Sequence, residues 1–143
     1  MKICIDTCVF IAVKNREEGH EHCEKILDAI DEGIIECVIS TVVIAEVLIG
    51  LYENNELRSA DMFIAHIIRK YEVVPLDERI AMYAAKLSVR SNMNIHDAII
   101  AATAYVKKAD FIISNDEDIK KMKRFIEIEV LKPEELVRKL KKD

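Results

Sequence analysis

Two aspartates in this chain come directly after short apolar runs that are typical of buried strands. Asp6 follows residues 2–5 (Lys-Ile-Cys-Ile), and Asp116 closely follows residues 111–114 (Phe-Ile-Ile-Ser). Asp is also favoured as the residue that caps a helix N-terminus, so each position has a purely structural alternative. Both positions are nevertheless suited to chemistry, because ligand sites in parallel sheets lie beyond the carboxyl ends of the strands.

Two further acids interrupt apolar segments with helical character. Glu46 is the one charged residue in segment 42–49, and a helix that is apolar all round is expected to be buried. A buried Glu is rare unless it is paired or binds a metal, although a Glu on a partly exposed face can extend into solvent. Asp97 opens the apolar segment 95–104, where Asn94 can cap the helix and Asp97 can interact favourably with the helix dipole.

These four carboxylates share one chemical requirement if they meet at one edge of a sheet. Carboxylates within about 4–6 Å of one another repel, which raises their pKa values. A hard divalent cation with oxygen ligands, Mg²⁺ or Mn²⁺, relieves that repulsion. Such an ion activates water and stabilises a leaving oxygen, so the set predicts phosphodiester hydrolysis. We expect Asp6 and Asp97 to hold the main ion, with Glu46 and Asp116 completing the site or holding a second one.

The other metal-binding residue types do not suggest a rival centre. The four Cys contain no C-x-x-C pair and most lie in apolar segments, so we interpret them as small buried hydrophobic residues. His20 and His22 lie in a stretch expected to be exposed, and His66 lies on an apolar helix face. His96 can contact Asp97 or a substrate, but a surface position is the simpler expectation.

Composition narrows the class of protein. The chain has 143 residues, 51% hydrophobic and 33% charged, which suits one domain spanning residues 1–143. It has no apolar run of the roughly 20 residues that a membrane span needs, and its N-terminus does not resemble a secretion signal, so we expect a cytoplasmic protein. The net charge is −5, which disfavours non-specific nucleic-acid binding unless a bound cation reverses the local charge.

The elements that must position these acids alternate along the chain. Strands are expected at residues 2–5, 36–39, 72–74, 111–114 and 126–130, and helices at 21–32, 41–51, 56–70, 78–91, 95–108, 117–123 and from Pro133 onward. Gly33 stands where a C-terminal helix cap is expected. Short strands that are apolar throughout are typical of parallel strands buried on both faces, which predicts a three-layer α/β/α domain.

The segments that carry the acids resemble, in order, the signatures of PIN domains. The similarity extends over nearly the whole chain and is carried by residues 5–11, 40–50, 95–104, 111–118 and 130–136. The chain is most similar to VapC-type toxins of toxin–antitoxin pairs and to their stand-alone archaeal relatives. Ser114 stands where Thr is commoner in the family and Ile119 where Phe is common, and neither departure removes a metal ligand.

The resemblance implies a central five-stranded parallel sheet and Mg²⁺- or Mn²⁺-dependent cleavage of single-stranded RNA. Acids that match Asp6, Glu46, Asp97 and Asp116 hold the metal in the family. The hydroxyl that matches Ser114 usually assists, and Asp118 matches a frequent additional acid, so both are candidate substrate-binding residues.

Possible partners follow from two further features. Segments 41–51 and 56–70 contain more apolar residues than one helix face against a sheet requires. The resemblance implies a homodimer through this region. Alternatively, the additional apolar residues fill the core of a thick α/β sandwich. A toxin-type relative also implies an antitoxin, whose cationic side chain could enter the acid cluster. The basic residues Lys120, Lys121, Lys123 and Arg124 can guide RNA or form a solvated helix face.

Two other classes of function remain open. A PIN-fold module without catalysis would bind RNA or a protein, but the presence of all four acids argues against it. A receiver or haloacid-dehalogenase-like phosphoacceptor would use Asp6, but the latter normally has a second Asp two residues on, where this chain has Cys8.

Overall fold

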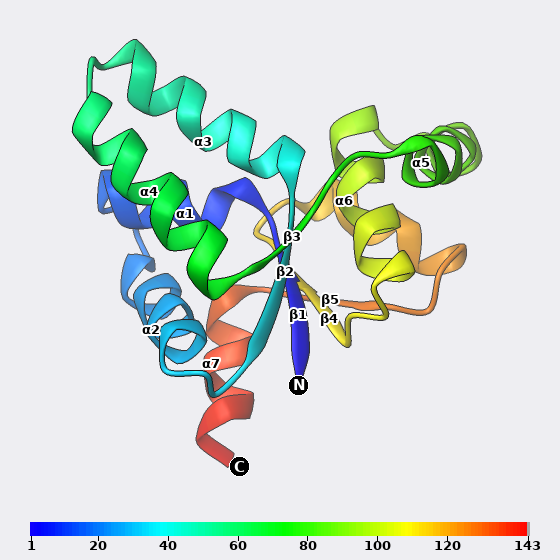
Figure 1. Ribbon diagram of the computed structural model, residues 1–143. Coiled ribbons are helices and arrows are strands. Elements are labelled where there is room, and N and C mark those ends of the chain that lie inside the picture. Colours follow the sequence, from blue (N-terminus) through cyan, green and yellow to red (C-terminus); the bar gives the residue numbers. More distant parts are fainter. Residues whose placement is uncertain (143) are drawn as a thin grey trace.

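Five strands form one parallel sheet in the computed structural model, which describes residues 1–142 (Figure 1). The strand order is β3-β2-β1-β4-β5. β1 (Lys2–Ile5) lies at the centre between β2 (Glu36–Ser40) and β4 (Phe111–Ile113), and β3 (Glu72–Val74) and β5 (Glu129–Leu131) form the edges. The expected five-stranded parallel sheet is therefore confirmed.

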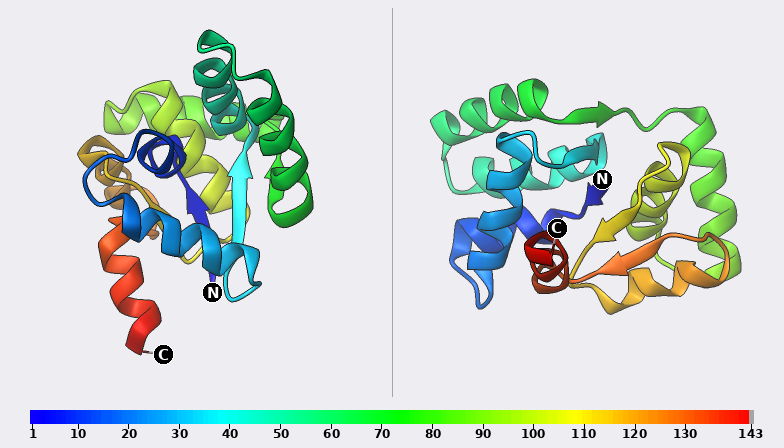
Figure 2. Two further views of the ribbon diagram at one scale, coloured as in Figure 1. Left: turned by 90° about the vertical axis from the view of Figure 1, so that its left-hand side faces the viewer. Right: turned by 90° about the horizontal axis from the view of Figure 1, so that it is seen from below.

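Helices cover both faces of this sheet, which gives the expected three layers (Figures 1 and 2). One face carries α1 (Thr7–Asn15), α2 (His20–Asp31), α3 (Thr41–Glu53), α4 (Leu57–Lys70) and α7 (Pro133–Lys142). The other face carries α5 (Glu78–Ser91), α6 (Ile95–Val106) and the 3₁₀ helix η1 (Glu117–Arg124). Because both faces are covered, strand residues such as Ile5, Ile39 and Ile112 are fully buried.

Local signals in the sequence explain where several helices begin and end. Ser40 caps α3 by accepting a hydrogen bond from the Val42 amide at 3.1 Å. Gly33 follows the last residues of α2 with a φ of 75°, a left-handed conformation that glycine adopts without a steric penalty. Pro133 is the first residue of α7, as expected for a residue that lacks an amide donor.

Two expectations about elements were incomplete or wrong. Helix α1 was not predicted, although Asp6 was recognised as a possible cap. The last strand was expected at residues 126–130 but forms at Glu129–Leu131. The amide of Ile126 instead donates to the Met122 carbonyl at 3.0 Å, so this apolar residue continues the turn that ends η1 before the strand begins.

The strand order places a topological switch beside β1. The chain builds the sheet outward from β1 through β2 to β3, and then returns to the other side of β1 to add β4 and β5. The helices that follow β1 and β4 therefore leave toward opposite faces, and ligands of parallel sheets bind at such a switch point, beyond the carboxyl ends of the strands. Asp6 directly follows β1, and Asp116 lies in the segment after β4.

Within residues 1–142, no helix combines the length and the apolar character needed to cross a membrane.

A carboxylate cluster at the switch point of the sheet

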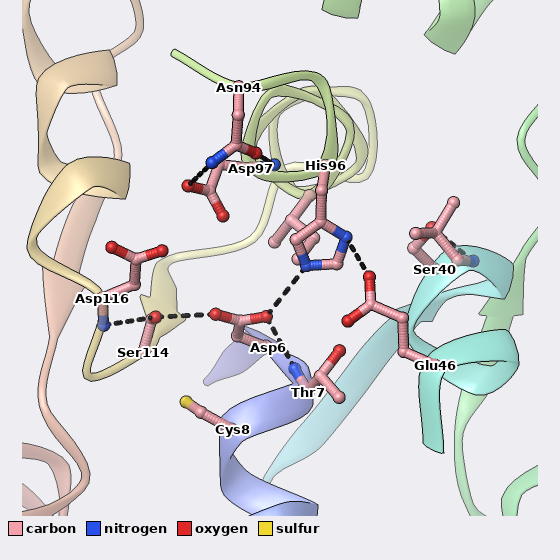
Figure 3. Close-up of polar contacts among 12 residues, drawn as sticks. Asp6, Thr7, Cys8, Ser40, Glu46, Asn94, His96, Asp97, Ser114 and Asp116 are labelled. Atoms are coloured by element: carbon pink, nitrogen blue, oxygen red, sulfur yellow. Dashed lines mark hydrogen bonds and ion pairs between the residues drawn. The ribbon is translucent and has the colours of Figure 1, made fainter. Parts of the chain in front are cut away.

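Asp6 lies at the centre of the candidate site, between Ser114 and His96, and directly follows the central strand (Figure 3). It is 5% exposed and caps α1, because its Oδ1 accepts a hydrogen bond from the Thr7 amide at 2.7 Å. Its Oδ2 accepts a second hydrogen bond from the Ser114 hydroxyl at 2.8 Å. Both carboxylate oxygens are therefore held in place by the protein.

Ser114 links the ends of β1 and β4. Its buried hydroxyl donates to Asp6 and accepts a hydrogen bond from the Asp116 amide at 3.0 Å. Because the one hydroxyl proton is directed at Asp6, Ser114 fixes the orientation of that carboxylate. Substrate contact by Ser114 stays a prediction.

Asp97 enters the same space from the first turn of α6 and is 1% exposed. A reciprocal pair of hydrogen bonds orients it: its amide donates to Asn94 Oδ1, and Asn94 Nδ2 donates to Asp97 Oδ2, both at 2.9 Å. The pKa of Asp97 is raised from 3.8 to about 6, mainly by burial and in addition by the neighbouring carboxyls of Asp116 and Asp6.

Asp116 lies opposite Asp97 and comes from the segment after β4 (Figure 3). It caps η1 by accepting a hydrogen bond from the Asp118 amide at 2.9 Å. The structural alternative considered for Asp6 and Asp116 is therefore confirmed, and it does not exclude the functional one, which stays a prediction. Each residue caps a helix and also faces the cluster.

Glu46 was expected to be buried, and this expectation was wrong. Helix α3 buries only the stripe of Val43, Val47 and Leu51, so the Glu46 side chain is 39% exposed. The carboxylate does turn toward the cluster, where it pairs with Nδ1 of His96 (Figure 3).

His96 is the site residue that sequence reasoning underestimated. Its imidazole lies between two acids, with Nδ1 against Glu46 and Nε2 3.5 Å from Asp6 Oδ1. The hydrogen bond to Asp6 raises the pKa of His96, burial opposes that rise, and the Glu46 charge adds to it. The one signal in the sequence was its position beside Asp97, and helical periodicity alone does not show that it faces α3.

Asp118 lies at the edge of the site and contributes its backbone amide, but not its carboxylate, to the polar network. Its carboxylate is exposed and lies 3.5 Å from the Lys121 ammonium, one turn along η1. Its role in substrate binding stays a prediction. Cys8, also near the cluster, accepts a hydrogen bond from the Asn115 amide through its sulfur at 3.5 Å.

The donors of this cluster suit a hard divalent cation in their chemistry, since they are carboxylate oxygens with a hydroxyl nearby. In residues 1–142, however, no three His, Cys, Asp or Glu side chains already form a group that could hold a metal ion. In this structure the His96 imidazole lies between Asp6 and Glu46 and contacts both carboxylates.

The raised pKa of Asp97 predicts an unusual effect of Asp97→Asn on stability. The folded protein binds the Asp97 proton more tightly than the unfolded chain, so ionisation of Asp97 destabilises the fold as the pH rises from about 4 to about 6. Above that range the penalty is constant, and the neutral Asn avoids it. We expect Asp97→Asn to stabilise the protein more at pH 7.5 than at pH 4. For each kcal/mol of destabilisation that the substitution removes, the difference in Tm between the variant and the wild type should be about 2–4 °C larger at pH 7.5.

Differential scanning calorimetry in EDTA measures this difference. The matched control is Asp61→Asn, because Asp61 is an exposed aspartate of α4. Its Tm should differ from that of the wild type by the same amount at both pH values. An Asp97→Asn protein that is no more stabilised at pH 7.5 than at pH 4 would contradict the electrostatic account.

Solved structures with the same fold include several toxin–antitoxin proteins. A chain of VapBC2 from Rickettsia felis, bound to a promoter DNA fragment, matches with a TM-score of 0.69 and 16% identity over 92% of this chain and 98% of that one. VapC20 of Mycobacterium tuberculosis, described as a toxin that cleaves the sarcin–ricin loop, matches with a TM-score of 0.66 and 20% identity over 89% and 98%. PAE2754 of Pyrobaculum aerophilum matches over both full lengths with a TM-score of 0.62 and 16% identity.

These structural matches show the shared fold. No curated protein sequence matches the chain significantly. The family model described as PIN domain matches residues 3–125, a range that includes all four acids of the cluster and His96. This chain is therefore a member of the PIN domain family.

Proposed function

We propose that this chain is a divalent-metal-dependent endoribonuclease that cleaves single-stranded RNA in the cytoplasm, built as one PIN-like domain over residues 1–143. The observation that carries the proposal is the convergence of Asp6, Glu46, Asp97 and Asp116, from four separate segments, on the switch point of the sheet. Helix capping accounts for Asp6 and Asp116 individually, but it does not require four acids to converge. A nuclease of this family is also what the PIN domain match supports.

Asp6, Glu46, Asp97 and Asp116 would hold Mg²⁺ or Mn²⁺. When bound, such an ion stabilises charge on the phosphate and the leaving oxygen and eases deprotonation of the attacking water. The chain's own residues prepare the site for it. Ser114 and the Thr7 amide orient Asp6, while Asn94 orients Asp97.

The buried position of Asp97 gives the protein a way to control the charge of the site. Near a pH of 6 this carboxyl exchanges a proton readily, and its proton must leave before it can serve as a ligand. The His96 imidazole offsets part of the negative charge of Asp6 and Glu46. Together these groups keep a crowded acidic site compatible with folding.

Metal-dependent cleavage is the direct test. Purified protein with Mn²⁺ should cleave a labelled single-stranded RNA, and EDTA should abolish cleavage. Asp6→Asn and Asp97→Asn should each lower the rate by about 100-fold or more, because ligand loss removes charge stabilisation in the transition state. Gel electrophoresis of the products measures the rate, and Asp61→Asn should cleave like the wild type.

Mn²⁺ or Mg²⁺ should also raise the Tm of the wild type, because binding to the folded state alone stabilises it, and the increase should be smaller in Asp97→Asn. A wild type that binds RNA but does not cleave it with either metal would favour a non-catalytic RNA-binding module. An Asp97→Asn enzyme with full activity would remove Asp97 from the site.

We further propose that the protein is the toxin of a toxin–antitoxin pair, as the named VapBC relatives suggest. A groove of about 360 Å³ between α1, α3 and α4 is lined mostly by apolar side chains, among them Phe10, Val47 and Phe63, and reaches Glu46. An amphipathic antitoxin helix would place its apolar face in this groove. A cationic side chain at the end of the helix, such as Arg, would then reach the acid cluster.

Gly50 gives a sharp test of that groove. It lines the groove, and a Cβ at this position would meet no atom within 4 Å, so Gly50→Arg should fold while filling the groove. Expression of the wild-type chain should arrest growth of a bacterial host, and co-expression of a small antitoxin encoded in the neighbouring reading frame should relieve the arrest. Gly50→Arg should still arrest growth but resist relief.

Val89→Arg, on the highly exposed surface of α5, is the matched control and should be relieved normally. Relief of Gly50→Arg at the wild-type level would place the antitoxin elsewhere.

A homodimer through α3 and α4 is the remaining proposal. Val43, Leu51 and Ile67 fill the core, but Met62 and Ile68 are 63% and 69% exposed. Ile68 lines a hollow of about 380 Å³ whose other walls are apolar residues of α3, α4 and β3 and Tyr71. A two-fold dimer would bury this surface twice and place two acidic sites along one RNA strand.

Ile68→Asp should therefore dissociate the dimer, because it would bury a carboxylate at the contact. Light scattering at tens of micromolar should give twice the chain mass of 16.4 kDa for the wild type and for Val89→Asp, and the single mass for Ile68→Asp. A wild type of 16.4 kDa at that concentration would rule the dimer out.

A further inference from the structure

A basic hollow lies between the C-terminal end of α5 and η1, the helix that Asp116 caps, and these two helices run close together (Figure 2). Its volume is about 400 Å³, and its charged lining consists of Arg90 from α5 and Lys120, Lys121 and Arg124 from η1. The chain as a whole carries a net charge of −5, so four cations around one hollow are a local reversal of charge. This hollow contains none of the residues assigned to the metal.

The two arginines are the cations of this hollow that are available to a ligand. Lys120 pairs with Glu117 at 3.2 Å, and Lys121 pairs with Asp118 at 3.5 Å. Across residues 1–142, by contrast, neither Arg90 nor Arg124 forms an ion pair, and both are exposed. A guanidinium presents a planar set of donors that matches two oxygens of one phosphate, so the pair suits an anionic backbone.

Phe125 adds an aromatic surface to the same place. It is 42% exposed, lines the basic hollow, and also lines a smaller neighbouring cavity of about 60 Å³ together with Tyr83 and Arg90. An exposed ring beside guanidinium groups is the combination on which unpaired bases stack in proteins that bind single strands.

Both walls of the hollow continue directly into the acid cluster. Asn92 lies in the hollow in a left-handed conformation with φ of 55°, and two residues later Asn94 holds Asp97. The other wall, η1, begins at its cap Asp116 and continues to Arg124. A strand whose phosphate is cut at the acids would therefore pass over this hollow within a few nucleotides.

We propose that this hollow is a docking subsite for the RNA strand, in which Arg90 and Arg124 bind backbone phosphates and Phe125 stacks on one unpaired base. The inference rests on the proposed ribonuclease function and adds to it the residues that hold the substrate. It also accounts for how a protein with a net negative charge can bind anionic RNA, since positive charge is concentrated in this hollow.

Fluorescence anisotropy with a labelled 12-nucleotide single-stranded RNA tests the subsite in EDTA, where binding is measured without cleavage. Arg90→Ala/Arg124→Ala should raise the Kd by about tenfold or more. It should also reduce the slope of log Kd against log salt by about 1.4, since each phosphate contact on a single strand contributes about 0.7. Phe125→Leu should raise the Kd by about fivefold or more and leave the salt slope unchanged, because it removes stacking but no charge.

The matched control removes two cations elsewhere. Arg138→Ala/Lys141→Ala lies on α7, which runs away from the site toward the opposite end of the sheet (Figure 1), and should bind RNA within about twofold of the wild type. Arg90→Lys/Arg124→Lys keeps the charge but loses the planar donor pair, and should bind more weakly than the wild type with an unchanged salt slope. Melting temperatures confirm that each variant is folded.

The outcomes separate this inference from the nuclease proposal. If Arg90→Ala/Arg124→Ala binds RNA as tightly as the wild type, or if the wild type binds none, the subsite is wrong. Cleavage by the wild type with Mn²⁺ would leave the nuclease proposal standing in the first case. If the double variant loses affinity while the wild type fails to cleave with any metal, the subsite stands and the nuclease proposal falls.

Discussion

Repulsion between partly buried carboxylates is the constraint around which the rest of this structure is arranged. Three aspartates and a glutamate meet at the switch point of the sheet (Figure 3), and one of them is held at a raised pKa by burial and by its neighbours. Each aspartate carboxylate accepts a hydrogen bond from the backbone or from a neutral side chain, and an imidazole lies between two of the acids.

The topology of the sheet determines which segments can supply those compensating groups. β1 is central, so its last residue is followed by a helix cap that has β4 on one side and β2 on the other. The hydroxyl of Ser114 reaches Asp6 because β4 pairs in register with β1, with Ile113 beside Ile5. The same arrangement brings the beginning of α6 close enough to α3 for His96 to pair with Glu46.

Much of this arrangement could be predicted from the sequence because it depends on local pattern. Short apolar runs predicted the strands, and the acids after them predicted the edge of the sheet at which the candidate site forms. Two details depended on packing instead. Glu46 belongs to a helix that is apolar on nearly every side, yet α3 is buried along one stripe only, so the expected burial was wrong. The segment that begins at Ile126 alternates apolar and acidic residues, which is typical of a strand. However, the Ile126 amide donates to the Met122 carbonyl, so strand pairing begins only at Glu129.

His96 shows the limit of such reasoning most clearly. Its role depends on the angle at which α6 faces α3, two helices that lie on opposite faces of the sheet and whose paired residues, His96 and Glu46, are 50 positions apart in the sequence. The spacing of residues within either helix does not determine that angle. The hollow at Arg90 and Phe125 is similar, because its two walls come from segments that only the fold places together.

The position of the acids along the chain has a consequence for how the protein is made. The candidate site combines Asp6, directly after the first strand, with Asp116, from the segment after the fourth, so most of the described residues lie between its first and last components. During translation, β4 cannot pair with β1 until β4 itself has left the ribosome. A nascent chain therefore carries no assembled acid cluster until the segment after β4 has emerged, and that delay follows from the positions of Asp6 and Asp116 in the sequence.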